Sequence, residues 1–594
     1  MRTNLRRWRR RAALAAVVAV LAPLIAAPAA AGPDDSGTIA GADRTRQALA
    51  RVAEVLRRPG ATADSEMALG LGSGLAVGAG HTCAIVLYAH LWCWGANDRA
   101  QLGVGGVTAA PGPVRTSATG RLRDKVFLGV AAGREHTCAV AFDPGGFGAY
   151  CWGGNDDGQI GDGGTARRTR PVEVAADVVA VAAGDAHTCA LSLELTVSCW
   201  GANDVGQLGV GVTGASDPTP QEVPGLTDVV ALSANENNTC ALRSDGGAWC
   251  WGSDTHGQLG NGGGASGTAV PTPTAVTTAG IAGGFMQISV GRRHVCALQT
   301  SARLSGRAYC WGEDGAGQLG NGTAAPDRSR PGPVAGDRGY VSVSAGGDAT
   351  CATTATGQGY CWGANPDGQL GTGNPAGHAA PALVDLGGVE VPAPVRLLFG
   401  VRRSMVTQIV LGAAHGCAAD VVSAVYCTGR NDTGQLGDGT TTDAAALRAV
   451  PLGPGPVTGV RARAGDGTLA VRWAAPADPG AAPVEEYVAV ASAGTSPSAL
   501  EDARSCASAR TLTCTVDGLR NGRRYTVFVL AAGPGGVSYS MFGQGTPEGG
   551  GGGGGLPITG PGASLVAGVL LVLAGAALRL GARRPIRTGP PGAP

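Results

Sequence analysis

Sixteen cysteines are the residues of this chain whose type and spacing point most directly to chemistry. Fourteen of them form seven pairs, and the members of a pair are 10, 13, 10, 10, 14, 10 and 10 residues apart. In five pairs a histidine stands two residues before the first cysteine, at His81, His136, His187, His294 and His415. Histidine and cysteine are zinc ligands, whereas paired cysteines form disulfides in oxidising compartments. The pattern therefore indicates either metal sites or disulfide staples.

The cysteine pairs belong to a phrase that recurs seven times between residues 66 and 453. Each copy has a short apolar run, a first cysteine, a second cysteine, and then Gln-Leu-Gly or Gln-Ile-Gly. The second cysteines of successive copies lie 48 to 66 residues apart. A period of this size is typical of propellers, solenoids and other repeat folds.

Four short strands are expected in each copy. Residues 179–182, 187–191 and 198–200 are predicted to be three of them, and nearby Pro-x-Val segments, such as the Pro-Val-Glu-Val of residues 171–174, indicate a fourth. No helix of useful length intervenes, so each copy is predicted to be a four-stranded antiparallel sheet, and seven such sheets form a β-propeller. A linear β-solenoid is the alternative, although its repeat is usually shorter and carries no paired-cysteine hairpin.

The motifs of the copies resemble the repeat of the regulator of chromosome condensation family. The resemblance rests on HTCA at 81–84 with WCWGANDRAQLG at 92–103, on YCWGGNDDGQIG at 150–161, and on YCWGEDGAGQLG at 309–320. It implies a seven-bladed propeller over residues 66–453. The copies depart from the pattern at Asn238 and Ala349, which replace the histidine, and at Thr428, which replaces the tryptophan. The nuclear member of the family exchanges guanine nucleotide on the GTPase Ran, and no Ran-type GTPase partner is expected for an exported bacterial chain.

Disulfides are favoured over zinc because the chain carries an export signal and contains no CxxC spacing. Cysteines on neighbouring strands of a hairpin can reach the 5.5–6 Å Cα separation of a disulfide, worth roughly 3 kcal/mol for loops of this size. One staple per blade is predicted, with an eighth pair further along the chain, and no free thiol remains. The predicted pairs are Cys83–Cys93, Cys138–Cys151, Cys189–Cys199, Cys240–Cys250, Cys296–Cys310, Cys351–Cys361, Cys417–Cys427 and Cys506–Cys514. The repeated histidines are then hydrogen-bonded structural groups, and neither a metal nor another cofactor is expected.

Tryptophan follows the second cysteine in six copies, at Trp94, Trp152, Trp200, Trp251, Trp311 and Trp362. Strand alternation places these rings on the opposite face of the sheet from the cysteines. The rings are predicted to fill the core between blades, and a ring of exposed ligand contacts is the alternative. Asn155-Asp156-Asp157-Gly158 resembles a calcium loop in part, but side-chain turns explain these residues without a metal.

Both ends of the chain are predicted to be targeting signals. Residues 1–31 have six arginines, an apolar run and a final Ala-Ala-Ala, which is typical of a secretory signal peptide, with a membrane anchor as the alternative. Residues 548–555 form a glycine-rich linker. Residues 556–594 then resemble an LPxTG sorting signal, with an apolar stretch from Ala563 to Leu578 and a basic tail.

The sorting motif consists of Leu556, Pro557, Ile558, Thr559 and Gly560. The resemblance implies sortase as a partner, cleavage between Thr559 and Gly560, and transfer of Thr559 to peptidoglycan. The predicted location is the cell wall or cell surface, after transient retention by the C-terminal membrane segment. A plain C-terminal transmembrane anchor is the alternative.

Two further segments complete the predicted organisation. Residues 32–65 form a lead-in with a short helix over Arg44–Arg58. Residues 455–547 resemble a fibronectin type III sandwich, because Leu469, Val471 and Trp473 alternate on one strand and Tyr525 occupies the place of the tyrosine corner. The predicted fold class is all-β, a seven-bladed propeller followed by a sandwich.

Charge and motif content restrict the function. Removal of both end signals leaves 35 basic and 44 acidic residues, a net charge of −9 that argues against nucleic-acid binding. One lysine among 45 basic residues, with abundant alanine and glycine, is typical of a GC-rich bacterial genome, in the first place an actinobacterial one. Walker A, GxSxG and HExxH motifs are missing from the sequence, and no catalytic residue is predicted.

The first functional prediction is a non-enzymatic surface protein that binds an unidentified extracellular protein or glycan through propeller loops. The connections around 262–284 and 373–404 are the first candidates for the binding site. The alternatives are an extracellular polysaccharide-degrading enzyme or its accessory subunit, and a structural spacer of the wall.

Overall fold

The structure is a computed structural model. It describes residues 74–548 except 87–89, 117–124, 144–145, 264–266, 268, 302–304, 325, 387–405, 421–423, 494–502, 510 and 534. The described residues form strands and no helix. The predicted signal peptide, lead-in helix, glycine-rich linker and sorting motif lie outside the described residues.

Seven four-stranded antiparallel sheets follow one another along the chain, each built from consecutive strands. The strands of blades 1 to 3 are β1 (Leu75–Val77), β2 (His81–Val86), β3 (His90–Gly95), β4 (Ala110–Arg115); β5 (Val126–Ala132), β6 (His136–Asp143), β7 (Gly146–Gly153), β8 (Arg168–Ala176); β9 (Val178–Ala183), β10 (His187–Ser192), β11 (Val197–Asn203) and β12 (Gly214–Glu222). The strands of blades 4 and 5 are β13 (Val229–Asn235), β14 (Asn238–Arg243), β15 (Ala248–Ser253), β16 (Ala269–Ala275); β17 (Phe285–Val290), β18 (His294–Gln299), β19 (Ala308–Gly312) and β20 (Arg328–Pro333). The strands of blades 6 and 7 are β21 (Tyr340–Gly346), β22 (Ala349–Thr354), β23 (Gly359–Gly363), β24 (His378–Leu383); β25 (Val406–Leu411), β26 (His415–Asp420), β27 (Val425–Gly429) and β28 (Ala444–Ala449).

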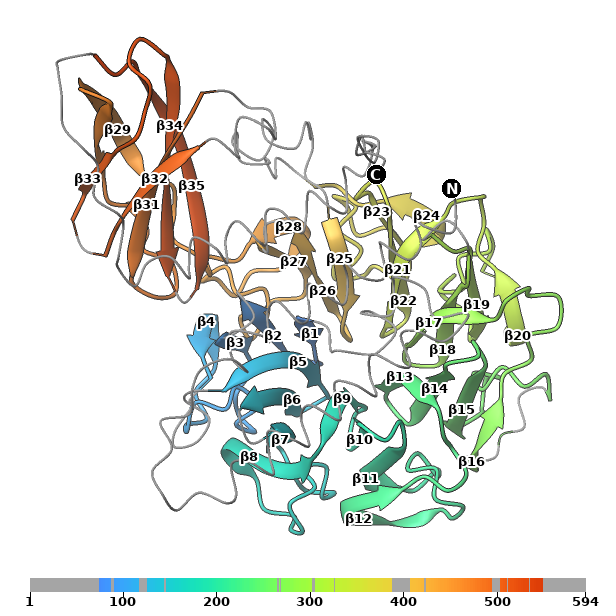
Figure 1. Ribbon diagram of the computed structural model, residues 1–594. Helices are drawn as coiled ribbons and strands as arrows, with labels where there is room; N and C mark the ends of the chain where they lie inside the picture. Colours follow the sequence, from blue (N-terminus) through green and yellow to red (C-terminus); the bar gives the residue numbers. More distant parts are fainter. Residues whose placement is uncertain are drawn as a thin grey trace, which may run out of the picture.

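The seven sheets are arranged as a closed propeller (Figure 1). The first strands of successive blades contact one another around the ring, and β25 of the last blade contacts β1 of the first. The fourth strands are therefore the outer edges. They match the segments predicted from Pro-x-Val patterns, and proline there suits an edge because it cannot donate to another strand.

Strand direction gives the propeller two faces. The turns between first and second strands lie at the same end of each sheet as the loops between third and fourth strands, and we call this end the front face. The opposite end, the back face, carries the remaining turns and the connections between blades. The segments 262–284 and 373–404, expected to be loops, each contain an outer strand, β16 and β24, because their prolines and small residues suit an edge strand.

The core lies between blades, and equivalent positions of the repeat supply it at successive interfaces. The cysteines of one blade are buried against the next blade, and the tryptophan after the second cysteine is buried against the blade before. Trp200, for example, packs with Cys138 and Cys151 of the previous blade. All six tryptophans are 0% exposed, so they fill the inter-blade core as predicted and are not a surface for ligands.

A β-sandwich follows the propeller. One sheet has the order β29 (Thr458–Gly465), β30 (Thr468–Ala474), β33 (Thr513–Val516), and the other has the order β32 (Arg504–Ser508), β31 (Glu486–Ser492), β34 (Tyr525–Gly533), β35 (Gly536–Gly545). The Tyr525 hydroxyl accepts a hydrogen bond from the backbone N–H of Arg520 at 3.0 Å, which is the contact of a tyrosine corner.

One leucine connects the two parts of the chain. Leu452 is 4% exposed and belongs to the core cluster of the first and last blades, and Ala481 and Ala482 of the sandwich pack against the same cluster. The backbone N–H of Ala481 donates to the carbonyl of Leu452 at 3.1 Å. The sandwich therefore leaves the propeller at the end of β28, which is the back face.

The described residues contain no helix that is long and apolar enough to cross a membrane.

Candidate functional site

All sixteen cysteines form disulfides in the pairs that the spacing indicates. In every blade the two cysteines are directly opposite each other on the second and third strands. Their Cα atoms are 4.1 Å apart, closer than the 5.5–6 Å expected. The physical reason is that facing residues on antiparallel strands without mutual hydrogen bonds approach to about 4.5 Å.

The five repeated histidines connect neighbouring blades. His136 Nε2 lies 2.9 Å from Thr188 Oγ1 in the next blade, and the Thr188 hydroxyl donates to the carbonyl of Gln159 at 2.9 Å. Because the hydroxyl proton is used for Gln159, the histidine must be the donor, so the neutral ring carries its proton on Nε2. The same relay occurs at His81–Thr137, His187–Thr239, His294–Thr350 and His415–Thr82.

Histidine and threonine are lost together. Blade 4 has Asn238 in place of histidine, and the facing residue in blade 5 is Val295. Blade 6 has Ala349, and the facing residue in blade 7 is Gly416. Both interfaces have a bond between inner strands, in which the Ser233 hydroxyl accepts from the N–H of Val290 and Ser344 accepts from Leu411. The interface of blades 5 and 6 has the same bond, from the N–H of Ala345 to Ser289, beside its histidine relay. The histidines are thus positioning groups of the interfaces.

Burial keeps these histidines neutral. Desolvation lowers the pKa of His81, His187 and His294 to about 4. It lowers the pKa of His136 and His415 to about 3, with neighbouring histidines of the ring acting in the same direction. Among the described residues no group of three or more His, Cys, Asp or Glu side chains is arranged to hold a metal ion.

The loops after the third strands are ordered by their own side chains. Asn155 Oδ1 accepts from the N–H of Ile160 at 2.9 Å, and its Nδ2 donates to the carbonyls of Gly164 and Ala166. Arg168 forms an ion pair with Asp162 in the same loop. Side-chain turns and an arginine therefore occupy the loop that resembles a calcium site.

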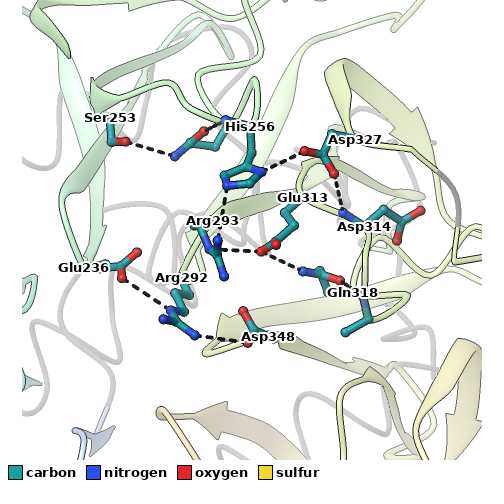
Figure 2. A network of polar contacts seen from close by, with 12 residues as sticks. Glu236, Ser253, His256, Arg292, Arg293, Glu313, Asp314, Gln318, Asp327 and Asp348 are labelled. Carbon is teal, nitrogen blue, oxygen red and sulfur yellow. Dashed lines mark hydrogen bonds and ion pairs between the residues drawn. The ribbon is translucent and has the colours of Figure 1, made fainter. Parts of the chain in front are cut away.

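The charged residues converge where the front face meets the inner strands. Arg292, in the turn of blade 5, lies between Glu236 of blade 4 and Asp348 of blade 6, at 3.4 Å from each carboxylate (Figure 2). Arg292 therefore bridges three blades.

Its neighbour Arg293 lies 3.1 Å from Glu313 and 3.2 Å from His256 Nε2. His256 Nδ1 is 2.8 Å from Asp327. Since Arg293 can only donate, His256 Nε2 accepts, and the Nδ1 proton points to Asp327. The ring nitrogen that a general base would need is thus occupied (Figure 2).

Two carboxyl groups in the front-face turns have raised pKa values. Desolvation raises the pKa of Asp185, and Arg134 and Arg292 act in the opposite direction. Desolvation also raises the pKa of Glu236, with Arg292 again opposing it and Asp185 adding to it. The two groups are in adjacent blades, where the N–H of Asp185 donates to the carbonyl of Glu236 at 3.0 Å. We call Arg134, Asp185, Glu236, Arg292 and Asp348 the mouth cluster.

The front face is acidic as a whole. Its seven turns and seven loops, defined by the strand bounds, carry seventeen acidic side chains and six arginines, a formal charge of −11. The described residues of the back-face turns and connections carry six acidic and three basic side chains. The front face is therefore the candidate binding face, and it points away from the attachment of the sandwich.

Sequence reasoning missed the mouth cluster. Its members occupy the two positions before the repeated histidine, which read Arg-Glu, Asp-Ala, Glu-Asn, Arg-Arg and Gly-Asp in blades 2 to 6 but Ala-Gly and Ala-Ala in blades 1 and 7. The available signal was that these two positions vary while the motif around them repeats. The signal points to a site only once the turns are known to meet at one end of the ring.

Curated proteins are similar to this chain over half of its length or more. The ultraviolet-B receptor UVR8 of Arabidopsis thaliana is 29% identical over 376 residues, which cover 62% of this chain and 79% of the receptor. The probable E3 ubiquitin-protein ligase HERC4 of Homo sapiens is 31% identical over 364 residues, 59% of this chain and 31% of the ligase. The human E3 ubiquitin-protein ligase HERC2 is 27% identical over 315 residues, and only 6% of its length is matched.

Solved structures agree at the level of the fold. Human WBSCR16 superposes with a TM-score of 0.51 at 20% identity, covering 61% of this chain and 94% of that chain. Yeast RCC1 (Prp20) superposes with a TM-score of 0.50 at 19% identity, covering 60% and 83%. The profile of the RCC1-like domain matches residues 41–391 and 149–472. The chain therefore belongs to the RCC1-like domain family.

Proposed function

We propose that this protein is an exported, wall-anchored binding protein without enzymatic activity. Its propeller presents the acidic front face to a partner with clustered positive charge, in the first place a basic protein. The observation that supports this most is the contrast between the front face, at −11, and the weakly charged back face. Complementary charge raises association rates and selects partners of opposite sign.

The remaining parts of the chain fit this role. The sandwich, which we propose to be of the fibronectin type III class, leaves the propeller at the back face and would hold the front face away from the wall. Eight disulfides suit an oxidising compartment. The signal peptide and the sorting motif, with sortase and peptidoglycan as partners, supply the export and the anchor in this proposal.

A pull-down with residues 32–547 tests the binding role. Extracellular proteins captured at low salt should be basic, and their retention should fall steeply as salt rises, because screening shortens the range of exposed charges. Neutralising three front-face carboxylates away from the mouth cluster (Asp157→Asn, Asp204→Asn and Asp367→Asn together) should weaken capture.

A matched triple variant on the back face (Glu194→Gln, Asp245→Asn and Asp337→Asn) controls for net charge. Equal loss in both triple variants, or salt-independent capture, would contradict the front-face assignment. No capture of any partner would favour the structural spacer.

A carbohydrate-degrading enzyme is the second candidate. It is favoured by one observation, the two carboxyl groups of Asp185 and Glu236 with raised pKa values in adjacent blades. Glycoside hydrolysis uses a pair of carboxyl groups, one protonated and one ionised. A glycan screen decides between the candidates: turnover that disappears in both Asp185→Asn and Glu236→Gln would support the enzyme.

A further inference from the structure

The eighth disulfide, Cys506–Cys514, differs from the other seven in its access to solvent. The fourteen cysteines of the propeller are 0–1% exposed, because each pair is covered by the next blade. Cys506 and Cys514 are both partly exposed and pack against the sandwich core. A reagent can approach this disulfide without opening the fold, whereas the other seven require separation of two blades.

Its place in the sandwich explains this exposure. Cys506 is on β32, the edge strand of the four-stranded sheet, and Cys514 is on β33, the edge strand of the three-stranded sheet. The disulfide thus joins the two sheets along one open side of the sandwich. Leu512 beside it is 39% exposed, and Thr513 and Thr515 are exposed as well.

We propose that Cys506–Cys514 is a site of thiol–disulfide exchange in the folded protein, with a dithiol as the co-substrate. One thiolate of the dithiol attacks a sulfur of the pair, forms a mixed disulfide and releases the other cysteine as a thiolate. The second thiol of the dithiol then displaces the first cysteine. The dithiol is oxidised to a disulfide, and its two electrons and two protons pass to Cys506 and Cys514.

Reduction releases the disulfide that joins the two sheets. β32 is then held by its pairing with β31, and β33 by its pairing with β30. The propeller disulfides stay oxidised, so the effect is confined to the sandwich.

The experiment treats the folded chain with dithiothreitol, or in a parallel arm with a thioredoxin-type protein, and traps thiols with N-ethylmaleimide before peptide mass mapping. Two adducts are expected, on Cys506 and Cys514, and none on the fourteen propeller cysteines. Reaction in either arm supports the site, and the arms tell a small dithiol from a protein dithiol. The double variant Cys506→Ser/Cys514→Ser should give no adduct under the same conditions.

Adducts on propeller cysteines at the same rate would overturn the proposal. So would the absence of any adduct until the whole chain is unfolded in denaturant. Hydrogen exchange provides a second measurement: β32 and β33 should exchange faster after reduction, and β10 and β11 should not.

Discussion

At the scale of single residues, the histidines of the repeat behave as neutral connectors between blades. A ring with its proton on Nε2 can donate to threonine, while Nδ1 of all five histidines is buried without a partner among the described residues. A second proton on Nδ1 of His81, His136 or His415 would therefore be buried and unpaired. The interface tolerates these histidines only in the uncharged form.

Stability should accordingly depend on pH. The folded-state pKa of each histidine is lowered below its ordinary value of 6.5, so the stabilisation is present above about pH 6.5 and is lost as pH falls toward 4. Each histidine contributes on the order of 3 kcal/mol over this window. Asp185, Glu236, Asp254 and Glu486, whose pKa values are raised, act in the opposite direction but are fewer than the five histidines.

Denaturant midpoints measured between pH 7.5 and 4 would reveal this loss, with disulfides intact throughout. In His136→Gln the slope of midpoint against pH should be smaller, because one titrating group has been removed. A midpoint that stays constant down to pH 4.5 would show that the histidines are not held neutral.

At the scale of elements, the loop of one blade is shaped to receive the tryptophan of the next. Trp200 Nε1 donates to the carbonyl of Gln159 at 2.9 Å, and Trp94, Trp152, Trp251, Trp311 and Trp362 make the equivalent bond. A Cβ at Gly161, the glycine of this Gln-Ile-Gly, would lie 2.5 Å from Trp200 Nε1. In blade 7, Thr428 occupies the position of the tryptophan, and its hydroxyl lies 2.7 Å from the carbonyl of Ala444 and 2.9 Å from the carbonyl of Gly368.

Two glycines of one loop allow the cost of a left-handed backbone to be measured apart from the cost of crowding the tryptophan. Gly161 and Gly163 have φ values of +86° and +84°, but a Cβ at Gly163 would find its nearest neighbour at 4.0 Å. Gly163→Ala should cost about 1–2 kcal/mol for the left-handed backbone alone. Gly161→Ala should cost a further 1–3 kcal/mol, roughly, because Trp200 must move.

Thermal or denaturant unfolding of the two variants measures this difference. Near-ultraviolet circular dichroism should change in Gly161→Ala and stay as in the parent in Gly163→Ala. Equal destabilisation of the two variants would mean that the tryptophan contact does not contribute to the free energy of unfolding.

At the scale of the whole molecule, no disulfide and no shared strand joins the last blade to the first within the described part of the chain. Every propeller disulfide is internal to one blade, and no strand of the last blade is shared with the first. Closure depends on side-chain contacts, among them His415 to Thr82 at 2.8 Å and Trp94 to the carbonyl of Gln435 at 2.9 Å. The disulfides therefore stabilise each blade, and the relays and tryptophans hold the blades together.

The proposed anchor makes a prediction at the same scale. Substitution of Thr559 by alanine should move the protein from the wall fraction to the membrane fraction, because Thr559 would form the bond to peptidoglycan and the apolar stretch would stay uncleaved. In the parent strain the protein should resist hot detergent and be released by wall-digesting enzymes. Release of the intact, basic-tailed chain by detergent alone would instead indicate a plain membrane anchor.

The sequence by itself determined the class of fold and the elements of each blade. A period-two pattern, a constant cysteine spacing and repeated turn residues are local signals, so the strands at 171–174, 187–191 and 198–200 and the buried tryptophans could be predicted. The disulfide pairs followed for the same reason, because each pair lies within one hairpin.

Tertiary structure alone decided which residues contact one another between blades and which are displayed on the two faces. The partner of His136 is 52 residues away, and the residues that Arg292 bridges are 56 residues before and after it. No spacing rule within one copy connects them, since these contacts exist only when the ring is closed. The acidic front face and the exposed eighth disulfide likewise depend on which strand ends and edges are brought to the surface.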